Sequence, residues 1–318
     1  MHDLTPPSAI RNPQSPIESP GRRAWQRFRQ NRLAVGCGLF LFLLVALLLV
    51  WPLTSSANPN ALSDAQFQSP GKSYWFGTDV HGRDLLARVF YGARISLLIG
   101  IVGASVSLII GVLWGAIAGY TGGRTDSVMM RFVDILYALP SIVFVIVLIT
   151  TLNGVLEKMQ SKGLSAEGAR VAQFICLFAG LGAVSWLTMA RIVRGQVLSL
   201  RARQFIDASR ALGASHGRIL LRHILPNVFG VIIVYLTLTV PSIILYESFL
   251  SFLGLGIRPP QASLGSLIAE GAMHINPIRI YWWLIAFPGG MLIMTLLALN
   301  FLGDGLRDAL DPRAGKSR

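Results

Sequence analysis

Few residues of this chain have types and spacing that could support covalent chemistry. Gly315-Lys316-Ser317 matches the end of a phosphate-binding loop, but Leu310 stands where that loop needs its first glycine. His216 and His223 lie on a cationic segment, at a spacing that suits an exposed helix face better than a pair of metal ligands. The sequence contains no HExxH pair and no cysteine cluster. It therefore indicates no catalytic residue, no metal site and no cofactor on this chain.

The segment 204–227 has instead the features of a docking surface for a partner protein. Its apolar residues recur at helical spacing, which predicts a short helix: Phe205, Ala208, Ala211 and Leu212. Asp207 suits the first turn, where the helix dipole favours an anion, and Gly213 suits the C-terminal stop. Ser215 can cap a second helix, and Pro226 suits the start of the next apolar run. We expect a compact docking knob; a basic loop lying on anionic lipid is the alternative.

The elements that must position this knob are membrane spans. Hydrophobic residues make up 53% of the chain and charged residues only 14%, whereas a soluble domain usually has about 25% charged residues. Each uncharged run is long enough to cross a hydrocarbon core of ~30 Å as a helix. This predicts an all-α integral membrane protein with six transmembrane helices, in runs 33–53, 95–123, 135–156, 171–190, 224–246 and 280–303.

The lysine and arginine residues are distributed unevenly between the two sides of these spans. The side that holds both termini and the segment 191–223 carries 19 of them, and the other side carries nine. Because cytoplasmic loops are enriched in Lys and Arg, we expect both termini in the cytoplasm. The net charge of +13 thus reflects membrane orientation, and we expect membrane lipid rather than nucleic acid as a partner.

Composition divides the chain into four parts. Residues 1–21 are proline-rich and predicted to be a disordered tail. Residues 22–94 are expected to form an amphipathic helix with Trp25 and Phe28 on one side, the first span and a periplasmic segment. Residues 95–303 form the core with a cytoplasmic loop at 191–226, and residues 304–318 form a cytoplasmic tail.

Small residues recur every four positions along the second predicted span. Such a ridge lets helix backbones approach closely in lipid, where association depends on packing. The sequence leaves open whether this seam faces the same chain or a second subunit. Its members are Gly103, Ser107, Gly111, Gly115 and Gly119.

The fifth apolar run is too long for one upright helix. Residues 224–257 contain one charged residue, Glu247, and one proline in the middle, Pro241. We expect a span followed by a short hairpin that ends near Pro260. An ionisable residue at membrane depth is a candidate for the transport pathway or a gate. Glu247 could equally lie at the outer interface, within reach of water.

A membrane protein without chemistry of its own conducts passively, couples to an ion gradient or takes work from a partner. A secondary transporter usually has charged relay residues within its spans and inverted repeats. These spans are nearly free of charge, which disfavours ion coupling. A partner motor needs a handle, and the docking knob provides one.

The knob resembles the coupling loop of ATP-binding-cassette (ABC) importer permeases, written EAA-x3-G-x9-I-x-LP. Asp207-Ala208-Ser209 stand for Glu-Ala-Ala, Gly213 follows at the right offset, and Leu225-Pro226 close the motif. Asp207 is one methylene shorter than glutamate, and His223 takes the isoleucine position. Together with FGTDVHGRDLLARVFYGARISL, YESFLSFLGLG and LNFLGDGLRDALDP, the resemblance covers residues 22–313. It points to the dipeptide, oligopeptide and nickel branch, and most to C-type permeases of oligopeptide importers.

The resemblance implies the type I ABC importer permease architecture in the bacterial inner membrane. The chain would form half of a pathway for oligopeptides, paired with a second homologous permease. Two cytoplasmic ATPases would bind ATP and Mg, and an extracytoplasmic binding protein would deliver the peptide. Dipeptides, nickel or another small solute are alternative cargoes, and an ATP-independent channel is an alternative class. The ATPase-coupling residues would be Asp207, Ala208, Ser209, Leu212, Gly213, Leu225 and Pro226.

Overall fold

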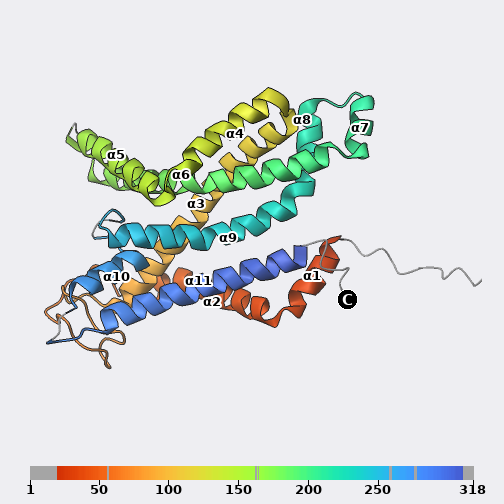
Figure 1. Ribbon diagram of the computed structural model, residues 1–318. Coiled ribbons are helices and arrows are strands. Elements are labelled where there is room, and N and C mark those ends of the chain that lie inside the picture. Colours follow the sequence, from red (N-terminus) through yellow and green to blue (C-terminus); the bar gives the residue numbers. More distant parts are fainter. Residues whose placement is uncertain are drawn as a thin grey trace, which may run out of the picture.

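The computed structural model describes residues 20–55, 57–161, 163, 165–257, 260–275 and 278–310, and nearly all of this part of the chain is helical (Figure 1). Six helices are long and apolar enough to span a membrane within the described ranges, which confirms the predicted number. The elements in order are α1 (Pro20–Gln30), α2 (Arg32–Thr54), α3 (Leu85–Thr121), α4 (Gly123–Ala138), α5 (Ser141–Ser161), α6 (Ala166–Arg201), α7 (Gln204–Ala211), α8 (His216–Arg218), the π-helical segment η1 (Ile219–Ile224), α9 (Leu225–Phe252), α10 (Leu264–Met273) and α11 (Trp283–Leu310).

The predicted third span, 135–156, is interrupted near its start. Leu139 has an extended backbone with ψ 137° and precedes Pro140, so α4 ends at Ala138 and α5 begins at Ser141. The residue before a proline is pushed out of the helical region, and proline itself cannot donate a helix hydrogen bond. The membrane-spanning part is therefore α5, and residues 124–134, between the predicted second and third spans, all lie in helix α4.

The region after the fifth predicted span also differs from the expected short hairpin. Helix α9 continues beyond residue 246 to Phe252 and stops before Gly254, which has a φ of +76°. The segment expected to be a loop then contains α10, whose start is fixed by a capping box between Ser263 and Ser266. This pair of serines, three residues apart, is visible in the sequence and indicates the start of a helix.

Several of the expected domain boundaries fall within or beside helices. Residues 94 and 95 lie inside α3, residues 303 and 304 lie inside α11, and residues 191–201 of the expected loop 191–226 belong to α6. Helix α1 begins at Pro20, inside the expected tail 1–21, and the rest of that tail lies outside the described residues. As expected, Trp25 and Phe28 share one side of α1, with their rings stacked at 5.9 Å.

The long helices α3, α6, α9 and α11 form the body of the molecule, and different shorter elements lie at its two ends (Figure 1). Helices α7 and α8 stand at one end, which we call the α7 end. Helix α10 and the segment 57–84 lie at the opposite end, which we call the α10 end. Residues between these ends form a continuous apolar core of α2, α3, α5, α6, α9, α10 and α11.

The seam of small residues on α3 faces helices of the same chain. A Cβ added at Gly111 would lie 2.6 Å from the Cβ of Met189 on α6, and one at Gly119 would lie 2.8 Å from a backbone oxygen of α6. Gly115 meets the backbone of α6 between these two contacts, and Ser107 is fully buried. Gly103 packs against Ile243 of α9 instead. The seam thus brings α3 and α6 into backbone contact.

Replacing Gly115 with alanine should destabilise the protein. The new Cβ would overlap the Ala190 carbonyl, so α6 would have to move, and such overpacking typically costs about 1–3 kcal/mol. Gly230→Ala on α9 is the matched control, because its Cβ would meet no atom within 4 Å. Thermal unfolding of both variants in detergent checks this. Equal midpoints for the two would contradict the backbone contact.

Candidate functional site

Helix α7 is a short helix anchored on one side and exposed on the other. Its anchor is Ile206, which is fully buried in a cluster with Val197 of α6 and with Ile219 and Ile224 of η1. Leu212, the C-cap residue that follows α7, is 88% exposed. Asp207, Ala208 and the other coupling residues predicted on α7 lie on or beside this exposed side. An apolar residue so exposed on a polar helix is typical of a protein contact.

The turn after α7 requires a glycine. Gly213 has a φ of +78°, a region that residues with a Cβ rarely adopt, and no atom lies within 4 Å of its absent Cβ. The Gly213 N–H donates to the Arg210 carbonyl, and the Ala214 N–H donates to the Ser209 carbonyl. These bonds close the C-terminal end of α7. The positive φ of this residue, and not a lack of room for a side chain, therefore favours glycine here.

The chain beyond this turn connects α7 rigidly to a long span. Ser215 caps α8 by accepting the Arg218 N–H at 3.4 Å, and His216 Nδ1 lies 2.9 Å from the Tyr120 hydroxyl at the end of α3. Segment η1 then runs into α9 without a break, with Leu225 and Pro226 in the first turn of α9. His216 is exposed as expected, but its bond to Tyr120 was not visible in the sequence.

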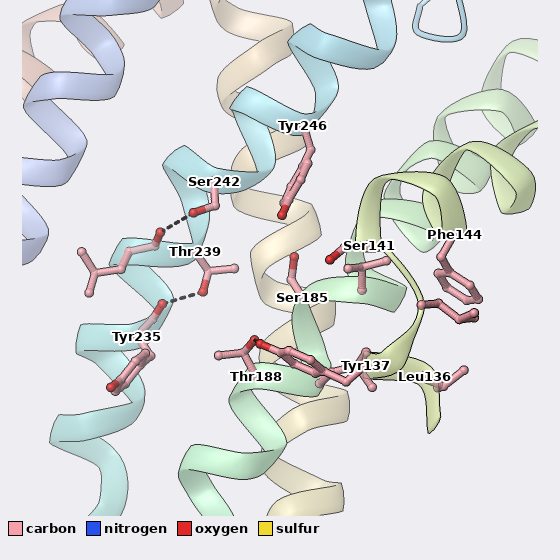
Figure 2. A pocket seen from close by; sticks show the side chains of 14 residues that line it. Leu136, Tyr137, Ser141, Phe144, Ser185, Thr188, Tyr235, Thr239, Ser242 and Tyr246 are labelled. Atoms are coloured by element: carbon pink, nitrogen blue, oxygen red, sulfur yellow. Dashed lines mark hydrogen bonds between the residues drawn. The ribbon is translucent and has the colours of Figure 1, made fainter. Parts of the chain in front are cut away.

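A pocket opens between α9, α6 and the α4–α5 corner (Figure 2). Its volume is about 260 Å³, and none of the described residues that line it is charged. Hydroxyl groups dominate its polar lining, and half of them form one stripe of α9. The hydroxyl residues are Tyr137, Ser141, Ser185, Thr188, Tyr235, Thr239, Ser242 and Tyr246.

Several of these hydroxyls are oriented by hydrogen bonds to their own helix. Thr239 donates to the Tyr235 carbonyl at 2.6 Å and Ser242 to the Leu238 carbonyl at 3.2 Å (Figure 2). A hydroxyl that donates in this way keeps its lone pairs as acceptors. The pocket can therefore accept N–H groups without selecting for charge. The spacing of Tyr235, Thr239, Ser242 and Tyr246 follows a helical face, a signal that the sequence analysis missed.

Glu247 lies inside the protein and not at a water-accessible interface, so that alternative is wrong. Its side chain is fully buried and accepts hydrogen bonds from Ser251 at 2.7 Å and Ser96 of α3 at 3.3 Å. Ser96 in turn accepts the N–H of Leu264, the first residue of α10. Glu247 thus links α9, α3 and α10. Pro241 is also buried, between the pocket residues Thr239 and Ser242.

Four charged residues join the segment before α3 to α10, and we call them the charge cluster: Asp79, Arg83, Arg88 and Glu270. Arg83 Nε lies 2.6 Å from Asp79 Oδ2, and Arg83 Nη2 lies 2.6 Å from Glu270 Oε1. Arg88 binds the same two carboxylates. Two cations and two anions make the cluster neutral, which allows its burial.

Asp79 is held as a carboxylate. Burial alone would raise its pKa, but the Arg83 backbone N–H and the charges of Arg88 and Arg83 together lower it below the usual value. The segment FGTDVHGRDLLARVF thus contributes three of the four residues of the charge cluster.

Comparison with known proteins assigns the family. Residues 111–316 match the family model described as binding-protein-dependent transport system inner membrane component. Residues 19–70 match the N-terminal transmembrane domain of oligopeptide transport permease C. The chain is an ABC importer permease. As a member of this family it is a multi-pass inner membrane protein, and it works with ATPase partners and a binding protein.

Curated relatives cover nearly the whole permease. It is 43% identical over 304 residues to the oligopeptide transport system permease protein OppC of Escherichia coli K12, covering 93% of this chain and 94% of that protein. It is 42% identical over 297 residues to OppC of Bacillus subtilis, covering 92% and 90%. The dipeptide transport system permease protein DppC of Bacillus subtilis is 42% identical over 293 residues, covering 91% and 85%.

A solved structure shares the fold. A chain of the methionine ABC transporter MetNI, crystallised in an inward-facing conformation, superposes with a TM-score of 0.54 at 19% identity. The match covers 71% of the permease and 98% of that chain. This similarity shows the fold alone.

Asp79→Asn should destabilise the permease strongly, because two buried guanidinium groups lose a counter-charge. Breaking a buried ion pair typically costs about 3–5 kcal/mol. Asp134→Asn is the control: Asp134 pairs with Arg191 on the surface, where a pair contributes about 0–1 kcal/mol. Unfolding midpoints of the two variants measure this difference.

The stability difference between wild type and Asp79→Asn should depend on pH. Because the pKa of Asp79 is lowered in the folded protein, its contribution is complete at neutral pH and is lost as the pH falls below about 4. The difference in free energy of unfolding between wild type and Asp79→Asn should therefore become smaller in acid. A difference that becomes larger in acid would contradict the lowered pKa of Asp79.

Proposed function

We propose that this permease provides half of the translocation pathway for oligopeptides in an ABC importer. The observation that carries the proposal is α7, a short helix that ends at an exposed leucine and is connected through α8 and η1 to α9, a span that lines an uncharged pocket. The names of the relatives support peptides as the cargo, since OppC is an oligopeptide permease and DppC a dipeptide permease. Dipeptide import is the second candidate, supported by the similar identity to DppC.

We propose that the complete importer contains a second homologous permease, two cytoplasmic ATPases and an extracytoplasmic peptide-binding protein. The excess of Lys and Arg on the side of α7 supports placing this end in the cytoplasm. ATP and Mg would be bound by the ATPases. This chain would contribute no catalytic residue and would act only by binding and moving.

In this proposal α7 sits in a cleft of one ATPase. Leu212 fills an apolar pocket of the ATPase, while Asp207, Ala208 and Ser209 face its surface. Closure of the ATPases pushes α7, and the buried contacts of Ile206 carry this movement into η1 and α9. Such a movement is a rigid-body change between two packed states.

Helix α9 is the proposed gate. Its hydroxyl stripe borders the pocket, so a swing of α9 would open or close it. Pro241 removes one helix hydrogen bond within this stripe and provides a place to bend. Glu247 holds the far end of α9 to α3 and α10. The inner part of α9 would therefore swing about a fixed outer end.

The pocket supports transport of varied peptides. All peptides share backbone N–H and carbonyl groups, and hydroxyls can bond both kinds. A pocket without charge neither attracts nor repels a particular side chain by electrostatics. Selection would then occur on the binding protein, before the cargo reaches the permease.

Gly213→Val should separate ATP hydrolysis from uptake. Valine cannot adopt the φ of +78° without strain, so the end of α7 would move and its docking surface would change. We expect peptide uptake in reconstituted vesicles to fall at least about tenfold, as expected for loss of about 1.4 kcal/mol of coupling. ATP hydrolysis by the purified complex, measured in parallel, should lose its dependence on the binding protein.

Gly217→Val is the matched control, since Gly217 also has no atom within 4 Å of its absent Cβ but lies in helix α8 with ordinary φ. Membrane insertion of both variants should equal that of wild type. Normal peptide uptake by Gly213→Val would show that α7 is not the coupling element.

A charge placed in the pocket should make transport selective. Ser185→Asp introduces an anion into a lining that has none, so acidic peptides should be taken up less than basic peptides of equal length. Competition between a Glu-containing and a Lys-containing tripeptide measures the ratio. Ser105→Asp is the control, because Ser105 is on α3 away from the pocket. An unchanged ratio would place the cargo elsewhere.

A further inference from the structure

A groove between α2, α3 and α11 opens at the α10 end of the molecule. Its larger part has a volume of about 480 Å³ and is lined by apolar side chains, among them Phe40 and Leu47 of α2 and Met294 of α11. A smaller cavity of about 70 Å³ continues it and is lined by Trp51 and Arg94. Phe90 lines both parts, and its ring contacts that of Trp51 edge to face at 4.9 Å. The two cavities therefore adjoin at Phe90, and together we call them the groove.

The length of this groove matches one leaflet of a bilayer. Its α2 side runs from Trp51 to Phe40, which is about 16 Å at 1.5 Å per residue. Half of a hydrocarbon core of ~30 Å is about 15 Å. If α2 spans the bilayer, Trp51, near its C-terminal end, would lie toward the membrane surface, and Phe40, near the middle of α2, would lie toward the bilayer centre.

The polar groups at the surface end have no partner in the described part of the protein. The Trp51 Nε1–H is buried and makes no hydrogen bond there. Arg94 makes no side-chain hydrogen bond or ion pair with any described residue. The side chain of Arg94 is exposed, whereas the buried Arg83 and Arg88 each bind a carboxylate. A cation and an unused N–H donor in one cavity fit an anionic oxygen ligand.

We infer that this groove binds a membrane phospholipid. The phosphate lies between the Arg94 guanidinium and the Trp51 Nε1–H, and one acyl chain lies in the apolar part of the groove between α2 and α11. A free phosphate would leave the apolar part unfilled, and a helix of a second permease would need a carboxylate placed opposite Arg94. Under the proposed orientation the lipid belongs to the extracytoplasmic leaflet; the site itself does not depend on this orientation.

The lipid would complete the packing of the first span. Helices α2 and α11 pack closely where Gly305 meets Ala34, and an acyl chain in the groove would add contacts where the two helices diverge. The phosphate would tie α3 to the end of α2. The bound lipid would thus act as a structural part of the transporter.

The first test measures lipid retention by the purified complex. Native mass spectrometry would follow binding of 1-palmitoyl-2-oleoyl phosphatidylglycerol to the delipidated complex. Arg94→Gln should lower the bound fraction about tenfold, as expected for one lost charge-assisted contact. Arg279→Gln is the control, because Arg279 is an exposed arginine outside the groove, and it should bind like wild type.

Trp51→Phe tests the second contact, because phenylalanine keeps an aromatic ring and lacks the N–H. It should reduce binding several-fold. Diacylglycerol, which has the chains without phosphate, should bind wild type as weakly as phosphatidylglycerol binds Arg94→Gln. Retention by Arg94→Gln equal to wild type, or equal binding of both lipids to wild type, would overturn the phosphate site.

The apolar part of the groove has its own matched pair of variants. Gly289 and Gly290 are neighbours on α11, and a Cβ at either meets no atom within 4 Å, but only Gly290 lines the groove. Gly290→Leu should therefore displace the acyl chain and reduce lipid binding, whereas Gly289→Leu should not. Equal binding by the two variants would exclude the groove as the chain site.

A photo-crosslinking residue at Leu47 identifies the occupant directly. Leu47 lines the groove and is 44% exposed. In the complete complex in native membranes, an adduct with the mass of a phospholipid supports the inference. An adduct to the polypeptide of a second permease would show that a partner helix fills the groove and would overturn it.

Discussion

The backbone contact between α3 and α6 is the constraint on which the rest of the permease depends. Glycines at positions 111, 115 and 119 let the two helices approach until side chains of α6 touch the α3 backbone. In lipid there is no hydrophobic force between helices, so this close packing is what holds them. Helix α6 carries Val197, against which Ile206 of α7 packs, and it also carries Ser185 and Thr188 of the pocket. The positions of both functional regions are therefore set by this pair.

The two ends of the molecule are held by different kinds of interaction. At the α7 end, isoleucines bury a short helix against η1 and α6, and one hydrogen bond joins His216 to Tyr120. At the α10 end, the charge cluster and Glu247 join α3, α9, α10 and the segment before α3. Apolar contacts tolerate small shifts, whereas ionic contacts require fixed geometry. The arrangement suits a protein that receives force at one end and holds its shape at the other.

The elements readable from the sequence were those with strong local signals. Run length gave the six spans, and the capping pattern around Asp207, Gly213 and Ser215 gave α7 with the correct stop and the correct next cap. Boundaries were less accurate where Pro140 divides one run and where the capping box at Ser263 starts a helix in a polar segment.

The tertiary contacts could not be read from one sequence. Asp79 and Glu270 are far apart along the chain, and nothing local shows that two arginines join them. The same holds for the carboxylate of Glu247, which is surrounded by serines from three elements. Burial of an ionisable side chain is decided by which helices meet there. The hydroxyl stripe on α9 is different, since its spacing was visible and only its neighbours were unknown.

The π-helical segment η1 contains one residue more than an α-helix over the same turn would need. In η1 the Leu225 N–H bonds the carbonyl of Leu220, five residues earlier, so Ile219 and Ile224 can both face the same core. A π-helical turn contains one residue more than an α-helical turn. Deleting one residue from η1 would therefore restore α-helical hydrogen bonding and leave the hydroxyls of α9 facing the pocket, whereas a deletion within α9 itself would turn the part beyond it by about 100°. Segment η1 is thus a place where the chain can lose a residue without changing the direction of the span that follows.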